Sequence, residues 1–167
     1  MFKLGDTVLY GACGVCKIED ITEKSFGSSV QNYYVLVPLN DKRSTFFVPV
    51  NSETLVSKMR FVMSAEEINS AIKDTSNTVE WIENDRKRRE VFKNLSSGGN
   101  FKETLSLARC IHNHGEKISG SGKKLHKNDE MLYKEAIKIL YEEISFSINI
   151  TKEEAENLLI NQKFLEN

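Results

Sequence analysis

Hydrophobic and polar positions alternate in short runs over the first third of the chain, which is the pattern of β-strands. Glycine, proline and polar residues separate these runs, and residues 25–29 form the clearest turn. The expected strands cover residues 7–10, 15–21, 32–37 and 44–48. Several short strands at close spacing predict a small SH3-like or Tudor-like β-barrel over residues 1–57. Closing such a sheet removes exposed strand edges, which invite aggregation.

After residue 57 the hydrophobic pattern changes to the 3.6-residue period of α-helices. Ser64-Ala65-Glu66-Glu67 and Thr151-Lys152-Glu153-Glu154 each fit a capping box, which marks a helix start. Residues 114–122, with three glycines and two serines, are expected to be a loop. The expected helices cover residues 64–73, 78–95, 100–113 and 128–145, with a last one from residue 151. The sequence therefore predicts an α+β protein, a β-barrel followed by an all-helical domain of about five helices over residues 60–165.

The 167-residue chain has the composition of a globular protein, and its formal net charge is -1. No apolar run reaches the ~18 residues that a transmembrane helix needs. Asp6 lies where a secretory leader would have its apolar core, so we expect no secretion. Three cysteines are too few for a disulfide framework, which favours a reduced, cytoplasmic protein.

The near-zero net charge hides an uneven distribution along the chain. Residues 1–58 are neutral overall, with six basic and six acidic side chains. Residues 78–127 carry eleven basic and six acidic side chains, a net charge of +5. Residues 128–167 carry four basic and nine acidic side chains, a net charge of -5. The basic segment can therefore bind a polyanion, which the acidic segment would repel.

Motifs for catalysis or metal binding are weak in this sequence. Cys13 and Cys16 match C-x-x-C but enter a strand instead of a helix, which favours two small apolar residues over a redox pair. Cys110, His112 and His114 fall within five residues, but two ligands on one helix face do not fill a zinc shell of four. The sequence has no nucleophile elbow and no P-loop. We therefore expect no enzymatic activity, no bound metal and no cofactor.

The densest cationic feature is Arg86-Lys87-Arg88-Arg89, followed by Lys93, on the helix expected over residues 78–95. Lysine and arginine favour phosphates through Coulomb attraction and counterion release. Four consecutive residues on a helix cannot all face one way, so some of them cover apolar surface with their stems. Trp81, the only tryptophan, is expected on the same helix. This pattern favours nucleic acid binding, and a solvated basic face is the alternative interpretation.

Four stretches of the chain resemble elements of one known family. They are Phe2-Lys3-Leu4-Gly5-Asp6-Thr7-Val8-Leu9-Tyr10, Phe46-Phe47-Val48-Pro49-Val50-Asn51, the helix end Leu95-Ser96-Ser97-Gly98, and Leu132-Tyr133-Lys134-Glu135-Ala136. They resemble the CarD/CdnL family of bacterial transcription regulators, and the resemblance covers nearly the whole chain. The first stretch is fairly specific for a module that this family shares with transcription-repair coupling factors.

The resemblance implies a non-enzymatic transcription regulator in the bacterial cytoplasm, associated with the nucleoid. Its Tudor-like domain would dock on the β subunit of RNA polymerase. Its helical domain would lie against promoter DNA at the upstream edge of the melted region, without sequence specificity. In the family a tryptophan wedges into the minor groove there and stabilises the open complex.

The candidate site residues combine this resemblance with the charge pattern. The candidate DNA-binding residues are Trp81, Asn84, Arg86, Lys87, Arg88, Arg89, Lys93, Lys123 and Lys124. The candidate polymerase-binding residues are Lys24, Thr45, Phe46, Phe47, Val48 and Pro49. Strand alternation puts Phe46 and Phe47 on opposite faces, so one of them is expected to be exposed. An ungapped comparison puts Asn84 at the family's tryptophan position, so Trp81 either takes over the wedge or belongs to the core.

Two other interpretations stay open at this point. In the first, the barrel binds a protein partner and the helices form a scaffold or dimerisation unit that does not contact DNA. The net charge of +5 over residues 78–127 argues against this interpretation, because a scaffold does not need a basic surface. In the second, Cys13 and Cys16 form a thiol-based sensor.

Overall fold

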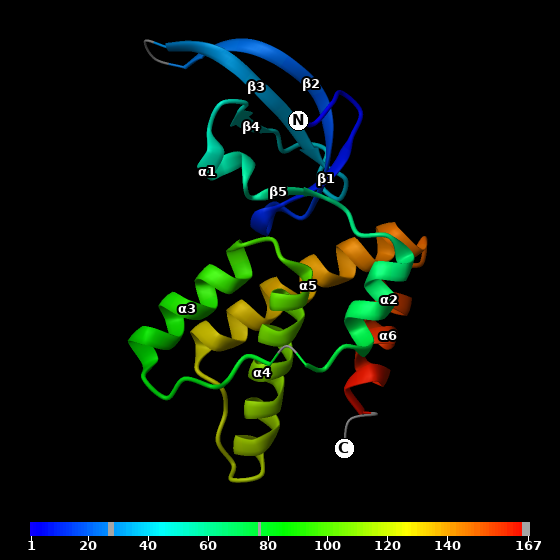
Figure 1. Ribbon diagram of the computed structural model, residues 1–167. Helices are drawn as coiled ribbons and strands as arrows, with labels where there is room; N and C mark the ends of the chain where they lie inside the picture. The colour runs from blue at the N-terminus through cyan, green and yellow to red at the C-terminus, as the bar shows by residue number, and fades with distance from the viewer. Residues whose placement is uncertain (27–28, 77, 165–167) are drawn as a thin grey trace. The chain divides into compact units, whose positions relative to one another are not determined.

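The computed structural model describes residues 1–26, 29–76 and 78–164 of the chain. The polypeptide forms two compact units, Met1–Val62 and Met63–Asn167 (Figure 1). Over the described residues, all strands belong to the first unit. Among the described residues, no helix is long and apolar enough to cross a membrane.

The N-terminal unit is built on a five-stranded antiparallel sheet (Figure 1). Its strands are β1 (Thr7–Tyr10), β2 (Val15–Phe26), β3 (Ser29–Pro38), β4 (Phe46–Pro49) and β5 (Met59–Phe61), in the order β4-β3-β2-β1-β5. A 3-10 turn, η1 (Gly11–Cys13), follows β1, and a short helix, α1 (Glu53–Val56), precedes β5. The buried core of this unit consists of Val8, Cys16, Ile18, Tyr34, Leu36, Val48 and Met59. The sheet confirms the predicted Tudor-like fold class.

The hairpin of β2 and β3 is longer than the sequence pattern indicates. The two strands pair from Cys16 opposite Pro38 to Phe26 opposite Ser29, with a bulge between Ile18 and Asp20. The prediction of a turn over residues 25–29 is therefore wrong for its outer residues, and residues 27 and 28 lie outside the described residues. The elements α1 and β5 were not predicted, because three or four residues are too few to display a period.

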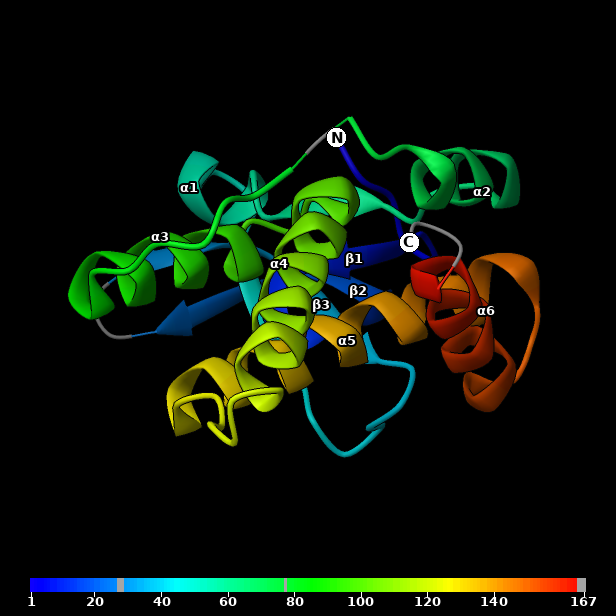
Figure 2. The ribbon, with the colours of Figure 1, turned by 90° about the horizontal axis from the view of Figure 1, so that it is seen from below.

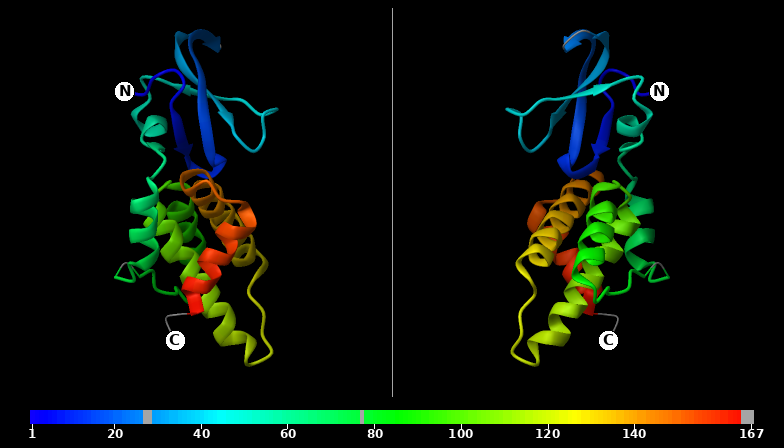
Figure 3. Two further views of the ribbon diagram at one scale, coloured as in Figure 1. Left: turned by 90° about the vertical axis from the view of Figure 1, so that its right-hand side faces the viewer. Right: turned by 90° about the vertical axis from the view of Figure 1, so that its left-hand side faces the viewer.

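Over its described residues the helical unit contains five helices, as predicted. They are α2 (Ala65–Lys73), α3 (Asp85–Ser97), α4 (Phe101–Ser119), α5 (Lys127–Ile148) and α6 (Lys152–Phe164). Helix α5 contacts each of the other four. In Figures 1 and 2, α3 lies at one side of this unit and α2 and α6 at the other, with α4 and α5 between them. Figure 3 shows the chain turning back between α4 and α5.

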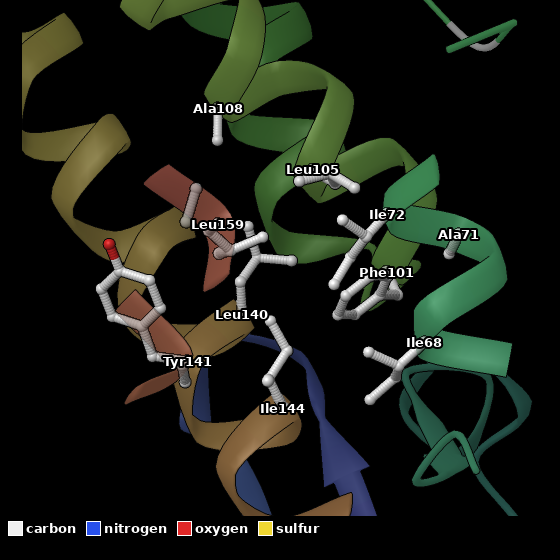
Figure 4. Packing of buried hydrophobic residues seen from close by; sticks show 12 residues of the cluster. Ile68, Ala71, Ile72, Phe101, Leu105, Ala108, Leu140, Tyr141, Ile144 and Leu159 are labelled. Atoms are coloured by element: carbon white, nitrogen blue, oxygen red, sulfur yellow. The ribbon is translucent and has the colours of Figure 1, made fainter. Parts of the chain in front are cut away.

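Two hydrophobic clusters stabilise the helical unit. The larger one joins α2, α4, α5 and α6, and Figure 4 shows its side chains pointing toward one another. It includes Ile68, Ile72, Phe101, Leu105, Leu140, Tyr141, Ile144 and Leu159. The smaller one joins α3 to α4 through Phe92, Leu107 and Ile111, with Trp81 packed against it. Each large apolar side chain contributes about 1.5–3 kcal/mol on full burial.

The prediction of a helix from residue 78 is wrong, because α3 begins only at Asp85. Asn84 caps this helix, since its side chain accepts a hydrogen bond from the Lys87 backbone N–H at 2.9 Å. Tertiary contacts hold the preceding segment in a non-helical path. The Val79 N–H donates to Ser106 Oγ at 2.9 Å, which ties this segment to α4. Trp81 therefore lies before the helix instead of on it.

The predicted loop over residues 114–122 is helical up to Ser119. Gly115, which suggested a loop, lies within α4 opposite Leu125. A Cβ atom at this position would lie 3.2 Å from Leu125 Cδ1, closer than an ordinary van der Waals contact. The glycine therefore allows the connection between α4 and α5 to pack closely against α4.

Candidate functional site

The cationic run on α3 divides into exposed and buried side chains. Arg86, Lys87, Arg89 and Lys93 are exposed, whereas Arg88 is only 3% exposed. A guanidinium buried in this way does not reach a phosphate on the surface. The prediction that Arg88 binds DNA is therefore wrong. The other cations of the run, Arg86, Lys87, Arg89 and Lys93, face solvent.

Arg88 joins α3 to α5 and to the segment before α3. Its Nε and Nη2 atoms donate to the two carboxylate oxygens of Asp129 at 3.1 and 3.0 Å, and Asp129 is 1% exposed. Its Nη1 atom donates to the carbonyl oxygens of Ile82 at 2.8 Å and Glu83 at 3.3 Å. Its Nη2 atom also pairs with Asp85. A bidentate pair of this kind fixes geometry strongly, since removal of either partner leaves a buried charge uncompensated.

Trp81 is half-buried, and three side chains pack against its indole. The His114 ring stacks on it with a centroid separation of 3.5 Å and an interplanar angle of 4°. The Arg88 Cζ atom lies over the indole, 4.4 Å from the Trp81 ring centroid. Phe92 packs edge-on against the indole at 5.8 Å between centroids. Contacts with His114, Arg88 and Phe92 therefore hold the indole in place.

The remaining candidates of the helical unit are exposed. Asn84 is exposed, but its side-chain oxygen already caps α3. Lys123 and Lys124 are exposed on the connection between α4 and α5. Both lie on the lining of a groove that also includes Trp81 and His114. The structure thus brings Lys123, Lys124 and Trp81 together around one hollow.

An aromatic cluster lies on the outer face of the β2–β3–β4 sheet. The Phe26 ring lies 5.2 Å from that of Tyr33 and 5.5 Å from that of Phe47, measured between centroids. The Lys24 ammonium lies 5.0 Å from the Phe47 ring centroid, a cation–π arrangement. Phe26 is 52% and Phe47 37% exposed, whereas Tyr33 is buried beneath them. We call Lys24, Phe26, Tyr33 and Phe47 the aromatic face.

The predicted polymerase-binding residues divide between the two faces of the sheet. Phe47 is the exposed member of its pair, and Phe46 packs against the core with Val48, which is fully buried. The prediction that Phe46 and Val48 contact the polymerase is therefore corrected, because side chains turned into the core do not offer a contact surface. Thr45 is exposed and Pro49 is half-buried. Sequence reasoning missed Phe26 and Tyr33. If the alternation had been continued along a longer β2–β3 hairpin, it would have placed both residues on the same face as Lys24.

The thiols and histidines do not form a reactive or metal-binding centre in the described part of the chain. Burial raises the pKa of Cys110 to about 11 and raises that of Cys13 above its usual range, so both thiols are protonated at neutral pH. His112 packs against Tyr133 and His114 against Trp81. Over the described residues no three His, Cys, Asp or Glu side chains are arranged to hold a metal ion.

Comparison with protein families matches residues 2–60 to the CarD-like/TRCF RID domain. The N-terminal unit is therefore similar to a RID domain, and we refer to it by that name. The match is consistent with a CarD-like family member and supports an interaction with RNA polymerase. RID domains of this family are non-enzymatic protein-interaction modules. Comparison with curated proteins found no match for the chain.

The RID domain match ends where the helical unit begins. It includes the aromatic face and every candidate polymerase-binding residue, from Lys24 to Pro49. The exposed cations of α3 and of the α4–α5 connection lie outside it. The family match thus bears on the polymerase partner, and any role of the helical unit has to be argued from its own side chains.

Proposed function

We propose that this protein is a bacterial transcription regulator that bridges RNA polymerase and promoter DNA. The RID domain binds the β subunit of the polymerase through its aromatic face. The helical unit binds DNA without sequence specificity near the upstream edge of the melted region and stabilises the open complex. The chain acts in the cytoplasm, at the nucleoid.

The observation that carries the DNA-binding half is the set of exposed cations on α3. Arg86, Lys87 and Lys93 form no ion pair within the described residues, so their charge is available to a polyanion. Helix α3 carries two acids: Glu90 is exposed, whereas Asp85 is engaged by Arg88 and Arg89, and the Arg89 hydrogen bond lowers the pKa of its carboxyl. Phosphate contacts of this kind carry no base information, which fits binding without sequence preference.

The polymerase half is tested by changing the aromatic face. The variant Phe47→Asp puts a charge at the centre of the exposed aromatic cluster, and we expect it to abolish retention of RNA polymerase in a pull-down. Val30→Asp is the matched control, because Val30 is exposed on the same hairpin but on the other face of the sheet. Equal retention by both variants would exclude this face as the polymerase contact.

The DNA half is tested by the salt dependence of binding. We expect Arg86→Gln/Lys87→Gln to weaken binding equally on unrelated duplexes and to lower the slope of log K against log salt by about two, one for each lost phosphate contact. The control Lys134→Gln/Lys152→Gln removes the same charge from exposed positions on α5 and α6. An identical slope in the two double variants would contradict the proposal.

A scaffold that does not contact DNA is the second candidate, and the state of Trp81 favours it. An indole that stacks on His114 and packs against Arg88 is not free to wedge between bases. Under this alternative the chain retains polymerase but has no measurable affinity for DNA at low salt. The same binding titration therefore separates the two candidates.

A further inference from the structure

Glu143 of α5 is a buried acid that belongs to neither of the proposed binding surfaces. Its side chain is fully buried, and its Oε1 atom accepts a hydrogen bond from the Met63 backbone N–H at 3.0 Å. A carboxyl group removed from water in this way is costly unless hydrogen bonds compensate for the lost hydration. Met63 lies 80 residues earlier in the chain and is the first residue of the helical unit. The buried acid therefore holds the point at which the chain enters this unit.

A second side chain of α5 holds the other polar backbone group of Met63. Ser147 follows Glu143 at the i, i+4 spacing and thus lies on the same face of the helix. Its hydroxyl donates a hydrogen bond to the Met63 carbonyl oxygen. The Met63 side chain packs against the hydrophobic cluster that joins α2, α4, α5 and α6. Met63 is thus fixed through its backbone and its side chain, and we call Met63, Glu143 and Ser147 the Met63 clamp.

The backbone on either side of the clamp is also held. Ser64 caps α2, because its N–H donates to Glu67 Oε2 at 2.7 Å and its Oγ accepts from the Glu67 N–H at 3.2 Å. On the other side, Phe61 is the last residue of β5 and pairs with β1. Val62 is thus the only residue between the last paired residue of the sheet and the clamp. One residue contributes two soft backbone torsions and spans at most about 3.6 Å.

The clamp attaches the entering chain to the longest helix of the unit. Helix α2, which follows the clamp, has only nine residues, whereas α5 has 22 and contacts the other four helices. Without the clamp, the short helix α2 alone would orient the entering chain. With the clamp, the direction in which the chain enters is set by the helix on which the whole unit is packed.

We propose that Glu143 and Ser147 are positioning residues, which fix the chain at Met63 and confine the free part of the connection between the two units to Val62. The inference rests on the proposed function, because a bridge between polymerase and DNA depends on how its two units are connected. Two binding units on one chain act together with an effective concentration that falls as their connection becomes longer and looser. The clamp therefore acts on the bridge and leaves the separate binding of polymerase and of DNA unchanged.

Proteolysis of the full chain tests the clamp without any partner. Chymotrypsin cleaves after Phe61 only when the backbone around this bond opens locally, and mass spectrometry identifies the fragments that end at Phe61 and begin at Val62. We expect Ser147→Ala to accelerate this cleavage about five-fold, because the loss of one hydrogen bond raises the open population by about that factor. Glu143→Leu removes the acceptor of the Met63 N–H and should accelerate cleavage at least as much. Glu143→Gln keeps an acceptor and should cleave at close to the wild-type rate.

Ser106→Ala is the matched control. The Ser106 hydroxyl also bonds to a backbone group outside its own helix, the Val79 N–H at 2.9 Å, but in a different part of the unit. Its loss should lower the melting temperature about as much as Ser147→Ala does, while cleavage after Phe61 stays at the wild-type rate. Equal acceleration by the two serine variants, or no acceleration by Ser147→Ala, would overturn the clamp.

The lifetime of open promoter complexes tests the positioning role. We expect Ser147→Ala and Glu143→Leu to shorten this lifetime per folded molecule, with retention of polymerase and affinity for DNA unchanged. Glu143→Gln and Ser106→Ala should keep the wild-type lifetime, which a loss of stability alone would not separate from the clamp variants.

Failure of this inference differs from failure of the proposed function. If the wild-type chain extends the lifetime and both clamp variants extend it equally, the function stands and the positioning role is overturned. If Ser147→Ala accelerates cleavage but the wild-type chain neither retains polymerase nor extends the lifetime, the clamp stands and the proposed regulator does not.

Discussion

Trp81 is fixed by contacts with His114, Arg88 and Phe92. We expect Trp81→Ala to lower the free energy of unfolding by roughly 2–3 kcal/mol, somewhat less than the loss for a fully buried tryptophan. Thermal melting measures this loss, and the lifetime of open promoter complexes per folded molecule is measured alongside. A structural role predicts a lower melting temperature with an unchanged lifetime. A shortened lifetime at unchanged melting temperature would restore the wedge role.

His114 makes the same cluster sensitive to pH. Burial lowers its pKa, Arg88 and Lys117 add to this effect, and Glu83 and Asp129 oppose it. As the pH falls through about 6.5, the unfolded chain takes up this proton before the folded chain does, so the free energy of unfolding decreases. Urea unfolding at pH 7.5 and 5.5 measures the decrease. His114→Gln should reduce this decrease.

At the scale of elements, the Arg88–Asp129 pair connects α3 to α5. Removing one partner leaves the other charge buried, so we expect Arg88→Met and Asp129→Leu each to cost about 3–5 kcal/mol. The double variant leaves no buried charge and should cost much less than the sum of the two. A double-mutant cycle by urea unfolding tests this, and additive losses would mean that the two side chains act independently.

The same elements explain which features the sequence could predict. Capping boxes at Ser64 and Thr151 marked two helix starts correctly, because their signal is local. The start of α3 was misplaced, because Asn84 is an equally local cap but the hydrophobic residues before it continue a helical pattern. Their burial against α4 is tertiary and invisible in a single sequence.

The candidate residues divided in the same way. Alternation correctly predicted that one of Phe46 and Phe47 is exposed, because opposite faces of a strand follow from local geometry. The burial of Arg88 depends on Asp129, 41 residues further along the chain, and no local pattern indicates such a partner. Lys123 and Lys124 were selected for their charge alone, whereas their position around a groove with Trp81 required the fold.

At the scale of the whole molecule, each unit carries its own hydrophobic core. The core of the RID domain lies between Val8 and Met59, and the two clusters of the helical unit lie beyond Met63. The two proposed partners use different physics. An aromatic anchor on the RID domain gives weakly salt-dependent binding, whereas lysine and arginine contacts to phosphates give steeply salt-dependent binding. Because each proposed binding function lies on a separately packed unit, we expect each unit to keep its function when it is produced alone.

We therefore expect fragments 1–62 and 63–167 to fold separately, with the first retaining polymerase and the second binding DNA. The shorter fragment should be only marginally stable, as domains of about 60 residues generally are. Stabilisation of the open complex should still require the intact chain, because attachment to polymerase raises the local concentration of the helical unit at the promoter to roughly the millimolar range. The measurement compares open-complex lifetimes with the intact chain and with an equimolar mixture of fragments. If the mixture extends the lifetime as much as the intact chain does at the same concentration, the two units do not act as a bridge.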